Sequence, residues 1–280
     1  MTEPTLTLLE AGSLVHPEHV ILRTGRLRPM RFPALFALIE HPAAGVVLFD
    51  TGHSQHFVRA TRRLPERLYT LLAPLTLGAG DGAVDQLRDR GLSAADVRHV
   101  VVSHFHADHV AGLKDFPRAT FHYLGAAWSA VRGLTGMAAL WRAYLPDVIP
   151  SDFEARSRLV EGCPEVALPP ECTPFLRGYD LFGDGALCGV PLPGHATGQL
   201  GLMVRTRSGP HLLVADACWT SQSYRAQILP HPLARLVFAD GAVYADTLAR
   251  LGELHRRAPS VPILPSHCAE VAARYVGRTT

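Results

Sequence analysis

Ser103-His104-Phe105-His106-Ala107-Asp108-His109 directly follows the apolar run Val100-Val101-Val102. The stretch places three imidazoles and one carboxylate within six positions. Imidazole and carboxylate groups suit zinc, manganese or iron. A lone His would more simply be a surface residue, or a buried side chain with satisfied hydrogen bonds. The H-x-H-x-D-H spacing at the end of an apolar run instead predicts a metal site.

Three later features share one pattern, in which an apolar strand ends and a side chain able to bind metal follows. They are His195 after Pro-Gly, Asp216 after Val-Ala, and His267 after Pro-Ser. Loops at strand ends are where an α/β scaffold brings ligands from distant positions to one cleft. With the first stretch they make seven candidate ligands: His104, His106, Asp108, His109, His195, Asp216 and His267. One zinc ion takes about four ligands, so the set predicts two divalent ions roughly 3.5–4 Å apart.

Composition favours one large domain over residues 1–280 and excludes several classes of partner. The chain is 48% hydrophobic and has a net charge of +2, so we expect no binding to nucleic acid or to an anionic membrane. It has no run of 18 apolar residues, so no membrane span is expected. The five Cys form no C-x-x-C pair, and the first residues show no secretory signal. These features predict a cytoplasmic protein.

Short apolar runs separated by Pro and Gly predict a chain rich in strands. The expected strands are 6–9, 20–22, 32–39, 46–49, 100–102, 120–124, 179–182, 186–190, 200–205, 211–215 and 261–264. The expected helices are 83–90, 111–114, 126–132 and 244–257. Asp50 follows a strand beside the Gly52 turn, where it either caps a loop or orients a metal-bound His.

Two segments interrupt this pattern and are predicted to be insertions that face the substrate. Residues 56–77 show an amphipathic helical pattern around Pro65, which indicates either a helix packed on the core or an apolar flap over a site. Residues 133–178 are irregular and rich in Pro, and they are too long for a plain connection in a compact domain.

The order of these motifs resembles the metallo-β-lactamase superfamily over roughly residues 30–270. The matching elements are Leu48-Phe49-Asp50-Thr51-Gly52, the H-x-H-x-D-H stretch, the Pro-Gly-His195 turn, Asp216 and the late Ser-His267. The resemblance implies an α/β fold, a four-layer αββα sandwich of two mixed β-sheets flanked by helices. It also implies that His104, His106 and His195 bind one metal, that Asp108, His109 and His267 bind a second, and that Asp216 bridges them.

The function implied is hydrolysis by a metal-bridging hydroxide, with Asp108 orienting the hydroxide and passing its proton to the leaving group. Zinc is the favoured metal, with manganese, iron or cobalt as alternatives. Among subfamilies the chain is most similar to N-acyl homoserine lactone lactonases, which are quorum-quenching enzymes. Those enzymes typically carry a Tyr three residues after the bridging Asp, where this chain has Trp219. The nearest Tyr is Tyr224, which either takes that role from a shifted loop or is a packing aromatic.

Other members of the superfamily fit the sequence less well. Exported β-lactamases carry a signal that is not seen here, nucleases need a basic face, and flavodiiron proteins have Glu where this chain has His106. Two alternatives stay open, an esterase or thioesterase of the same fold and a non-catalytic member that binds a metabolite. The expected partner is a small-molecule substrate with an acyl chain, and a homodimer is left open.

Overall fold

The computed structural model describes residues 3–280. Its strands are β1 (Thr5–Pro17), β2 (Pro29–His41), β3 (Gly45–Phe49), β4 (Leu75–Thr76), β5 (Val97–Val101), β6 (Thr120–Tyr123), β7 (Ser157–Leu159), β8 (Glu165–Ala167), β9 (Arg177–Asp180), β10 (Leu187–Pro191), β11 (Leu200–Thr206), β12 (Gly209–Ala215) and β13 (Ile263–Pro265). Its α-helices are α1 (Glu18–Ile21), α2 (Gln55–Ala60), α3 (Arg67–Leu72), α4 (Ala83–Arg88), α5 (Ala107–Val110), α6 (Gly125–Ser129), α7 (Gly136–Leu140), α8 (Ser221–Ala226), α9 (Gly241–Arg257) and α10 (Ala269–Tyr275). Short 3-10 turns include η1 (Leu113–Asp115), η2 (Pro146–Val148) and η6 (Ala234–Val237).

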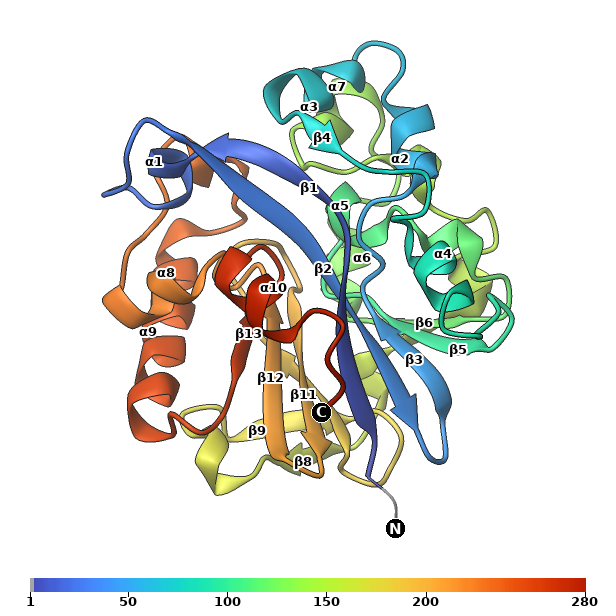
Figure 1. Cartoon of the computed structure of the whole chain (residues 1–280), viewed down its shortest axis with the longest axis vertical. Coiled ribbons are helices and arrows are strands. Elements are labelled where there is room, and N and C mark those ends of the chain that lie inside the picture. Colours follow the sequence, from blue (N-terminus) through green and yellow to red (C-terminus); the bar gives the residue numbers. More distant parts are fainter. Residues whose placement is uncertain (1–2) are drawn as a thin grey trace.

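The strands form two mixed sheets that lie face to face between the helices (Figure 1). One sheet has the order β4-β1-β2-β3-β5-β6-β7, and the other has the order β13-β12-β11-β10-β9-β8. Pairing is parallel from β3 through β7 and between β12 and β13, whereas β1 with β2 and β10 with β11 are antiparallel. The predicted αββα sandwich is confirmed.

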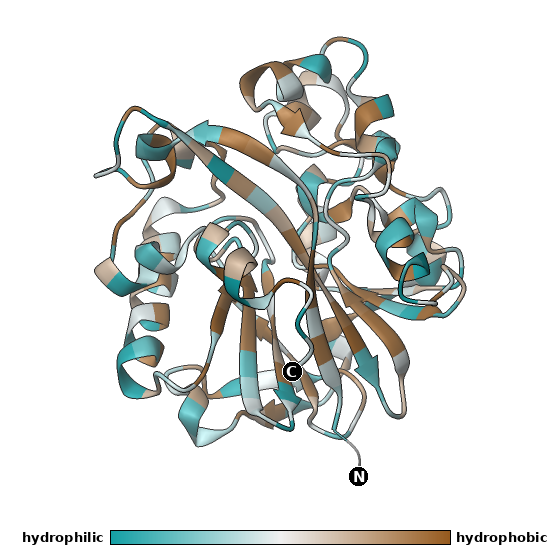
Figure 2. Ribbon diagram, in the orientation of Figure 1, coloured by the Kyte–Doolittle hydropathy of each residue, from teal (hydrophilic) through white to brown (hydrophobic). Residues whose placement is uncertain are grey.

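Strand β2 shows how the sequence separates the layers. Leu35, Ala37 and Ile39 point into the core between the sheets, while the alternate residues Phe36 and Leu38 belong to the core under the helices outside. Successive side chains of a strand point to opposite faces, so a strand that is covered on both sides is apolar throughout. Figure 2 shows hydrophobic residues running along the strands and hydrophilic residues gathering on the outer helices and turns.

Helix α9 covers the outer face of the second sheet. Its buried side chains Leu248, Leu251 and Leu254 recur at helical spacing and pack with Leu212 and Val214 of β12. Each such side chain contributes about 1.5–3 kcal/mol when fully buried. The side chain of Asp240 accepts hydrogen bonds from the first backbone N–H groups of the helix, which fixes where the helix begins.

Several predicted elements differ in the structure. Residues 20–22 are not a strand, because β1 continues to Pro17 and then gives way to α1. Gly12 does not break β1 but marks a shift in its register. The helix expected over 111–114 is not formed: α5 ends at Val110, and the 3-10 turn η1 follows from Leu113. Helix α10 was not predicted.

The two predicted insertions hold short elements. Residues 56–77 are not one helix: α2 ends before Pro65, and α3 and β4 follow it. Pro lacks the backbone N–H that a continuous helix needs and clashes with the preceding turn. Residues 133–178 contain α7, β7, β8 and several 3-10 turns. Within residues 3–280, no helix is long and apolar enough to cross a membrane.

Candidate metal centre

The candidate ligands lie where strands of the two sheets end. His104 follows β5, Asp216 directly follows β12, and His267 follows β13. Backbone hydrogen bonds join these ends: Leu200 N–H donates to the carbonyl of Ser103 (2.8 Å) across the sandwich, and within the second sheet Ser266 N–H donates to that of Ala215 (3.3 Å). The ligand-bearing loops are therefore fixed to one another by the scaffold.

Gly194 sets the position of His195. A Cβ at residue 194 would lie 2.3 Å from the backbone N and Cα of Tyr244, and Gly194 has a φ of +128°. Only glycine combines that backbone conformation with so close an approach. The Pro-Gly-His turn therefore packs directly on the start of α9, where Asp240 N–H donates to the Gly194 carbonyl.

The structure brings all seven candidate ligands together in two groups. His104, His106, His195 and Asp216 form one group, and Asp108, His109 and His267 form the other. The ligand atoms within each group lie within 4.8 Å of one another. Six of the seven residues are buried, and His106 is half-buried. The resemblance implied the same division of the histidines.

Asp216 lies between the two groups. Its Oδ1 is 3.1 Å from His109 Nε2 and 3.0 Å from His267 Nε2, while its Oδ2 is 3.1 Å from His195 Nε2. One oxygen therefore faces each group, the arrangement that a carboxylate shared by two cations requires. The indole N–H of Trp219 donates to Oδ2 (2.9 Å) and fixes the carboxylate in this orientation.

Hydrogen bonds to the remote ring nitrogens fix the tautomers of three histidines. His109 Nδ1 lies 2.8 Å from Asp50 Oδ2, and His267 Nδ1 lies 2.7 Å from the carbonyl of Pro33. Both acceptors carry no proton, so Nδ1–H donates and Nε2 is the nitrogen that can offer a lone pair to metal. Burial alone would lower the pKa of His109, but the carboxylates of Asp216, Asp108 and Asp50 raise it well above its usual value, so a metal ion would have to displace a proton from its Nε2. Ser103 Oγ–H donates to Asp50 Oδ2 (2.7 Å), which leaves the hydroxyl oxygen to accept from His104 Nδ1–H (2.9 Å). Asp50 thus orients candidate ligands of both groups. The sequence left open whether Asp50 caps a loop or orients a histidine, and the structure supports the second interpretation.

The ligand atoms that face the two groups are suited to bind a cation. Within the described chain, Nε2 of His104 is buried without a hydrogen-bond partner. Nε2 of His109 and Nε2 of His267 crowd the same oxygen, Asp216 Oδ1, at 3.1 and 3.0 Å, and make no other hydrogen bond to a described residue. A buried polar atom left unpaired costs roughly 1–3 kcal/mol. Metal ions held by the two groups would satisfy these atoms, and neutral imidazole with carboxylate is a donor set that suits zinc, manganese, iron or cobalt.

Burial sets most of the protonation states. It lowers the pKa of His106 to about 4 and that of His195 to about 3, although nearby carboxylates oppose the shift. Burial alone would raise the pKa of Asp216, but the charges of His267, His109 and His195 outweigh it and hold that pKa well below its usual value. At neutral pH His106 and His195 are therefore neutral and Asp216 is ionised, the forms that bind metal.

A cavity of about 210 Å³ opens over both groups. Its floor is formed by His106, Asp108, His195 and Asp216, and Trp219 lies beside them. Its walls are mostly apolar and come from β1, α1, β2, α3 and η6; they include Leu14, Val20, Ile21, Phe32, Ala73, Leu233, Ala234 and Val237. The site therefore combines a polar floor with apolar walls.

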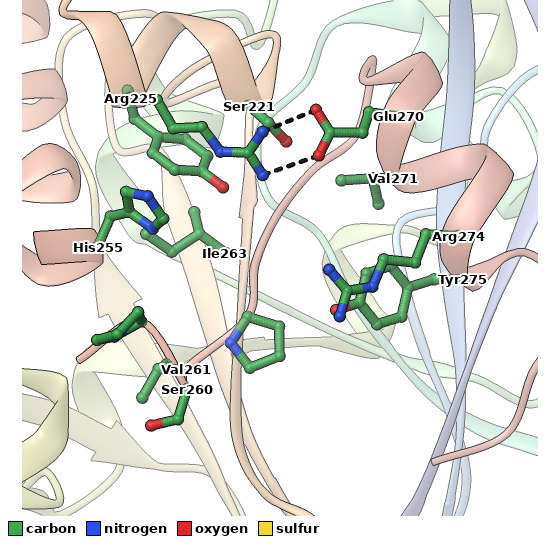
Figure 3. A pocket seen from close by; sticks show the side chains of 13 residues that line it. Ser221, Arg225, His255, Ser260, Val261, Ile263, Glu270, Val271, Arg274 and Tyr275 are labelled. Carbon is green, nitrogen blue, oxygen red and sulfur yellow. Dashed lines mark hydrogen bonds and ion pairs between the residues drawn. The ribbon is translucent and has the colours of Figure 1, made fainter.

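Tyr224 is not among the residues that line this cavity. It lines a different one of about 240 Å³, together with Ser221, Arg225 and His255. Figure 3 shows that cavity, with the Arg225 guanidinium joined to the Glu270 carboxylate by two hydrogen bonds of 2.9 and 2.8 Å. None of the seven candidate ligands lines it.

Two residues near the ligands were missed by sequence reasoning. Tyr69 of α3 lines the cavity over the candidate ligands. The amphipathic pattern of residues 56–77 indicated a packed helix or a flap but did not single out Tyr69. His53, in the turn after Asp50, is fully buried and packs edge-on against Phe57 with ring centroids 4.7 Å apart. Burial lowers the pKa of His53 to about 4. The position of His53 directly after Gly52, in the turn that follows Asp50, was the sequence feature that could have identified it.

Comparisons with known proteins agree with this geometry. Residues 31–258 match the metallo-beta-lactamase superfamily. The chain is 30% identical over 250 residues to N-acyl homoserine lactonase AttM of Agrobacterium fabrum, covering 85% of each chain. It is 28% identical over 234 residues to the probable metallo-hydrolase Rv2300c of Mycobacterium tuberculosis, covering 80% of this chain and 71% of that one.

Solved structures show the same fold. An N-acyl homoserine lactone hydrolase with N-hexanoyl-L-homoserine at its catalytic metal centre aligns with a TM-score of 0.75 at 18% identity, covering 98% of this chain and 97% of that one. The hydrolase AbOPH aligns with a TM-score of 0.65 at 15% identity, covering 96% and 88%. With the ligand order, the two-sheet sandwich and the family match in agreement, the chain belongs to the metallo-beta-lactamase superfamily.

Proposed function

We propose that the protein is a dinuclear metal-dependent hydrolase that acts on a lactone or a related ester, of the N-acyl homoserine lactone type that quorum-quenching enzymes cleave. The observation that carries the proposal is the position of Asp216, with one oxygen facing each group of imidazoles. The similarity to N-acyl homoserine lactonase AttM supports the substrate class.

In this proposal His104, His106 and His195 hold one ion, Asp108, His109 and His267 hold the other, and Asp216 bridges them. Two bound divalent ions would lower the pKa of a water between them and polarise the carbonyl under attack.

Asp108 is the residue that handles the proton. Its Oδ2 lies 3.4 Å from His267 Nε2, and its side chain also lines the cavity. Burial alone would raise the pKa of Asp108, but the charges of His109 and His267 lower it. An ionised carboxylate at the cavity floor can orient a nucleophilic water, accept its proton and pass that proton to the leaving alkoxide.

The walls support an acyl chain as the rest of the substrate. Phe32 stacks on His267 with ring centroids 3.9 Å apart, and Leu14, Val20, Ile21 and Val237 add further apolar surface to the cavity wall. At about 210 Å³ the cavity is smaller than the roughly 300–1,000 Å³ of most small-molecule sites, which favours a short acyl chain.

One observation favours an esterase or thioesterase as the second candidate. Trp219 stands three residues after Asp216 and its N–H is already donated to that carboxylate. It is therefore not free to hold a lactone oxygen. A lactone and an open-chain ester or thioester of equal acyl length separate the two candidates, because only a lactonase should prefer the ring.

The proposal is tested by metal content and hydrolysis measured on one preparation. We expect about two equivalents of metal, and EDTA-sensitive hydrolysis of a γ-lactone or of p-nitrophenyl acetate. His106→Ala should lose metal and activity, because it removes a ligand. A protein that binds metal but hydrolyses none of these substrates would instead indicate the non-catalytic, metabolite-binding alternative, and a metal-free inert protein would refute the site.

The setting is proposed to be reducing. The five cysteines all lie in the described part of the chain and are free thiols, four of them buried. Free thiols support the cytoplasmic expectation.

A further inference from the structure

Arg142 lines a second, small cavity beside the candidate ligands. His106, His195 and Val237 line both this cavity and the larger one over the candidate ligands (the metal cavity). The two cavities therefore adjoin at the two histidines, where His106 Nδ1 lies 3.0 Å from His195 Nε2. Among the described residues that line either cavity, Arg142 is the only Lys or Arg. It supplies a fixed positive charge next to the site.

The end of helix α7 fixes the backbone of Arg142. Arg142 N–H and Tyr144 N–H both donate to the carbonyl of Ala139, at 2.9 and 3.0 Å. Ala143, between them, has a φ of +48°. Many helices end on such a left-handed residue, but it is usually Gly, because the conformation is costly for a residue with a Cβ. Contacts from the rest of the fold must therefore hold this turn in place.

Two such contacts tie the turn to the ligand-bearing stretch. The Ala143 carbonyl accepts from the N–H of Ala107 (2.9 Å), the residue between His106 and Asp108. The next side chain, Tyr144, is buried in the core of the first layer. The segment that carries Arg142 is thus fixed to the same loop that carries four candidate ligands.

The guanidinium of Arg142 is available to a ligand. Arg156, in the same insertion, pairs with Asp152 at 2.8 Å. Arg142 is exposed and forms no ion pair or side-chain hydrogen bond with any residue in the described part of the chain. A planar guanidinium matches a carboxylate, because two parallel N–H groups can donate to its two oxygens.

The size of the small cavity limits what it can hold. Its volume is about 30 Å³, which admits roughly two or three atoms the size of a water molecule. That is the size of a carboxylate and too small for an acyl chain. The other side chains of the wall are mostly apolar, among them Phe105, Ala127 and Val131, so Arg142 is where a charged group would bind.

We propose that Arg142 is a specificity-determining residue, which binds a carboxylate on the leaving part of the substrate while the acyl part occupies the metal cavity. The substrate class is then a lactone or ester that carries a carboxylate next to the bond that is cleaved. The role in turnover rests on the proposed hydrolytic function, whereas binding of the carboxylate does not.

Kinetics with two matched lactones test the role in turnover. One is a γ-lactone with a carboxylate on the carbon bonded to the ring oxygen, and the other is its neutral carboxamide, which has the same shape. We expect wild-type kcat/KM to be at least about five-fold higher for the carboxylate. Arg142→Gln should remove this preference by slowing the carboxylate alone, and Arg142→Lys, which keeps the charge but not the paired N–H groups, should retain part of it.

Arg132→Gln is the matched control, because Arg132 is also exposed but lines neither cavity. It should keep the wild-type preference. No preference in the wild type, the same preference in Arg142→Gln, or an equal loss for both lactones would overturn the proposal. The last result would mean that Arg142 only stabilises the end of α7.

Equilibrium binding separates this proposal from the proposed function. The probes are the corresponding cyclopentanones, in which a CH₂ group replaces the ring oxygen so that neither can be hydrolysed. By titration calorimetry of the protein as purified, we expect the wild type and Arg132→Gln to bind the carboxylate at least about five-fold more tightly than the carboxamide, and Arg142→Gln to bind both equally. If the wild type hydrolyses neither lactone, the proposed function fails and binding alone decides the role of Arg142. Equal or undetectable binding of both ketones by the wild type would overturn it.

Discussion

Asp50→Asn is expected to weaken metal binding without removing any ligand. Asp50 is completely buried; its Oδ2 accepts from His109 and from the Ser103 hydroxyl, and its Oδ1 accepts from Ser103 N–H (2.8 Å). An Asn at this position can keep the bond from Ser103 N–H with its oxygen. Its amide NH₂ group then faces His109 Nδ1, which must accept and so moves the ring proton to Nε2, the atom that would bind metal.

The same change reaches the other group through Ser103. The Ser103 hydroxyl would accept from the new NH₂ group and would donate its own proton to His104 Nδ1. The tautomer of His104 then reverses as well. Replacing a residue that orients a metal ligand typically costs about 10–100-fold in metal affinity, which corresponds to ~1.4–2.7 kcal/mol.

Metal affinity of stripped protein, measured by competition with a chelator, is the assay. Asp115→Asn is the matched control, because Asp115 Oδ1 pairs with His56 Nε2 at 2.7 Å but neither residue lines the metal cavity. We expect wild-type affinity in the control and weaker binding at both groups in Asp50→Asn. Wild-type affinity in Asp50→Asn would refute the reasoning about tautomers.

Three further outcomes are expected. Asp108→Asn should lower kcat by about 10²-fold or more and change KM little; an unchanged kcat would remove Asp108 from proton transfer. Tyr224→Phe should leave lactone turnover unchanged, because Tyr224 lines a separate cavity, whereas a clear loss of turnover would return it to the substrate. Burial, with smaller contributions from the charges of His99 and Arg158, lowers the pKa of His122 to about 3. The unfolded chain therefore binds the extra proton, and the free energy of unfolding falls as pH drops below roughly 6.5, by up to ~1.4 kcal/mol per pH unit. Urea unfolding between about pH 7 and 5 should show a weaker dependence in His122→Gln, and parallel curves would contradict this.

The clustering of the candidate ligands could be predicted because the segments that carry them follow strands that are apolar on both faces. Val100 and Val101 point to opposite sides of the first sheet and are both buried, so the run is apolar without interruption and the polar stretch after it stands out. The same holds for Val214 and Ala215 before Asp216. Strand ends in such a sandwich meet at one edge. The position of each motif directly after an apolar run therefore predicted that the motifs lie close together.

Partners distant in sequence were harder to predict. The bond between Asp50 and His109 joins residues 59 positions apart, and its existence depends on the parallel pairing of β3 with β5. The sequence therefore allowed two alternative roles for Asp50, capping a loop or orienting a histidine. Likewise, His267 Nδ1–H donates to the backbone carbonyl of Pro33. A backbone acceptor cannot be predicted from residue type, because every residue has a carbonyl.

The residues that line the cavity over the candidate ligands were the hardest to predict, because closeness in sequence was a poor guide to closeness in space. Tyr224 lies eight positions after Asp216, but Thr220 caps α8 between them and the helix carries Tyr224 toward the cavity beside α10. Tyr69 lies far earlier in the chain, in a helix with no buried residue, and the amphipathic pattern of that segment did not reveal that Tyr69 shares the cavity with Asp108. A helix that covers a site must leave much of its surface unburied if it is to open. The residues that contact substrate are therefore expected in segments that the fold leaves partly unburied.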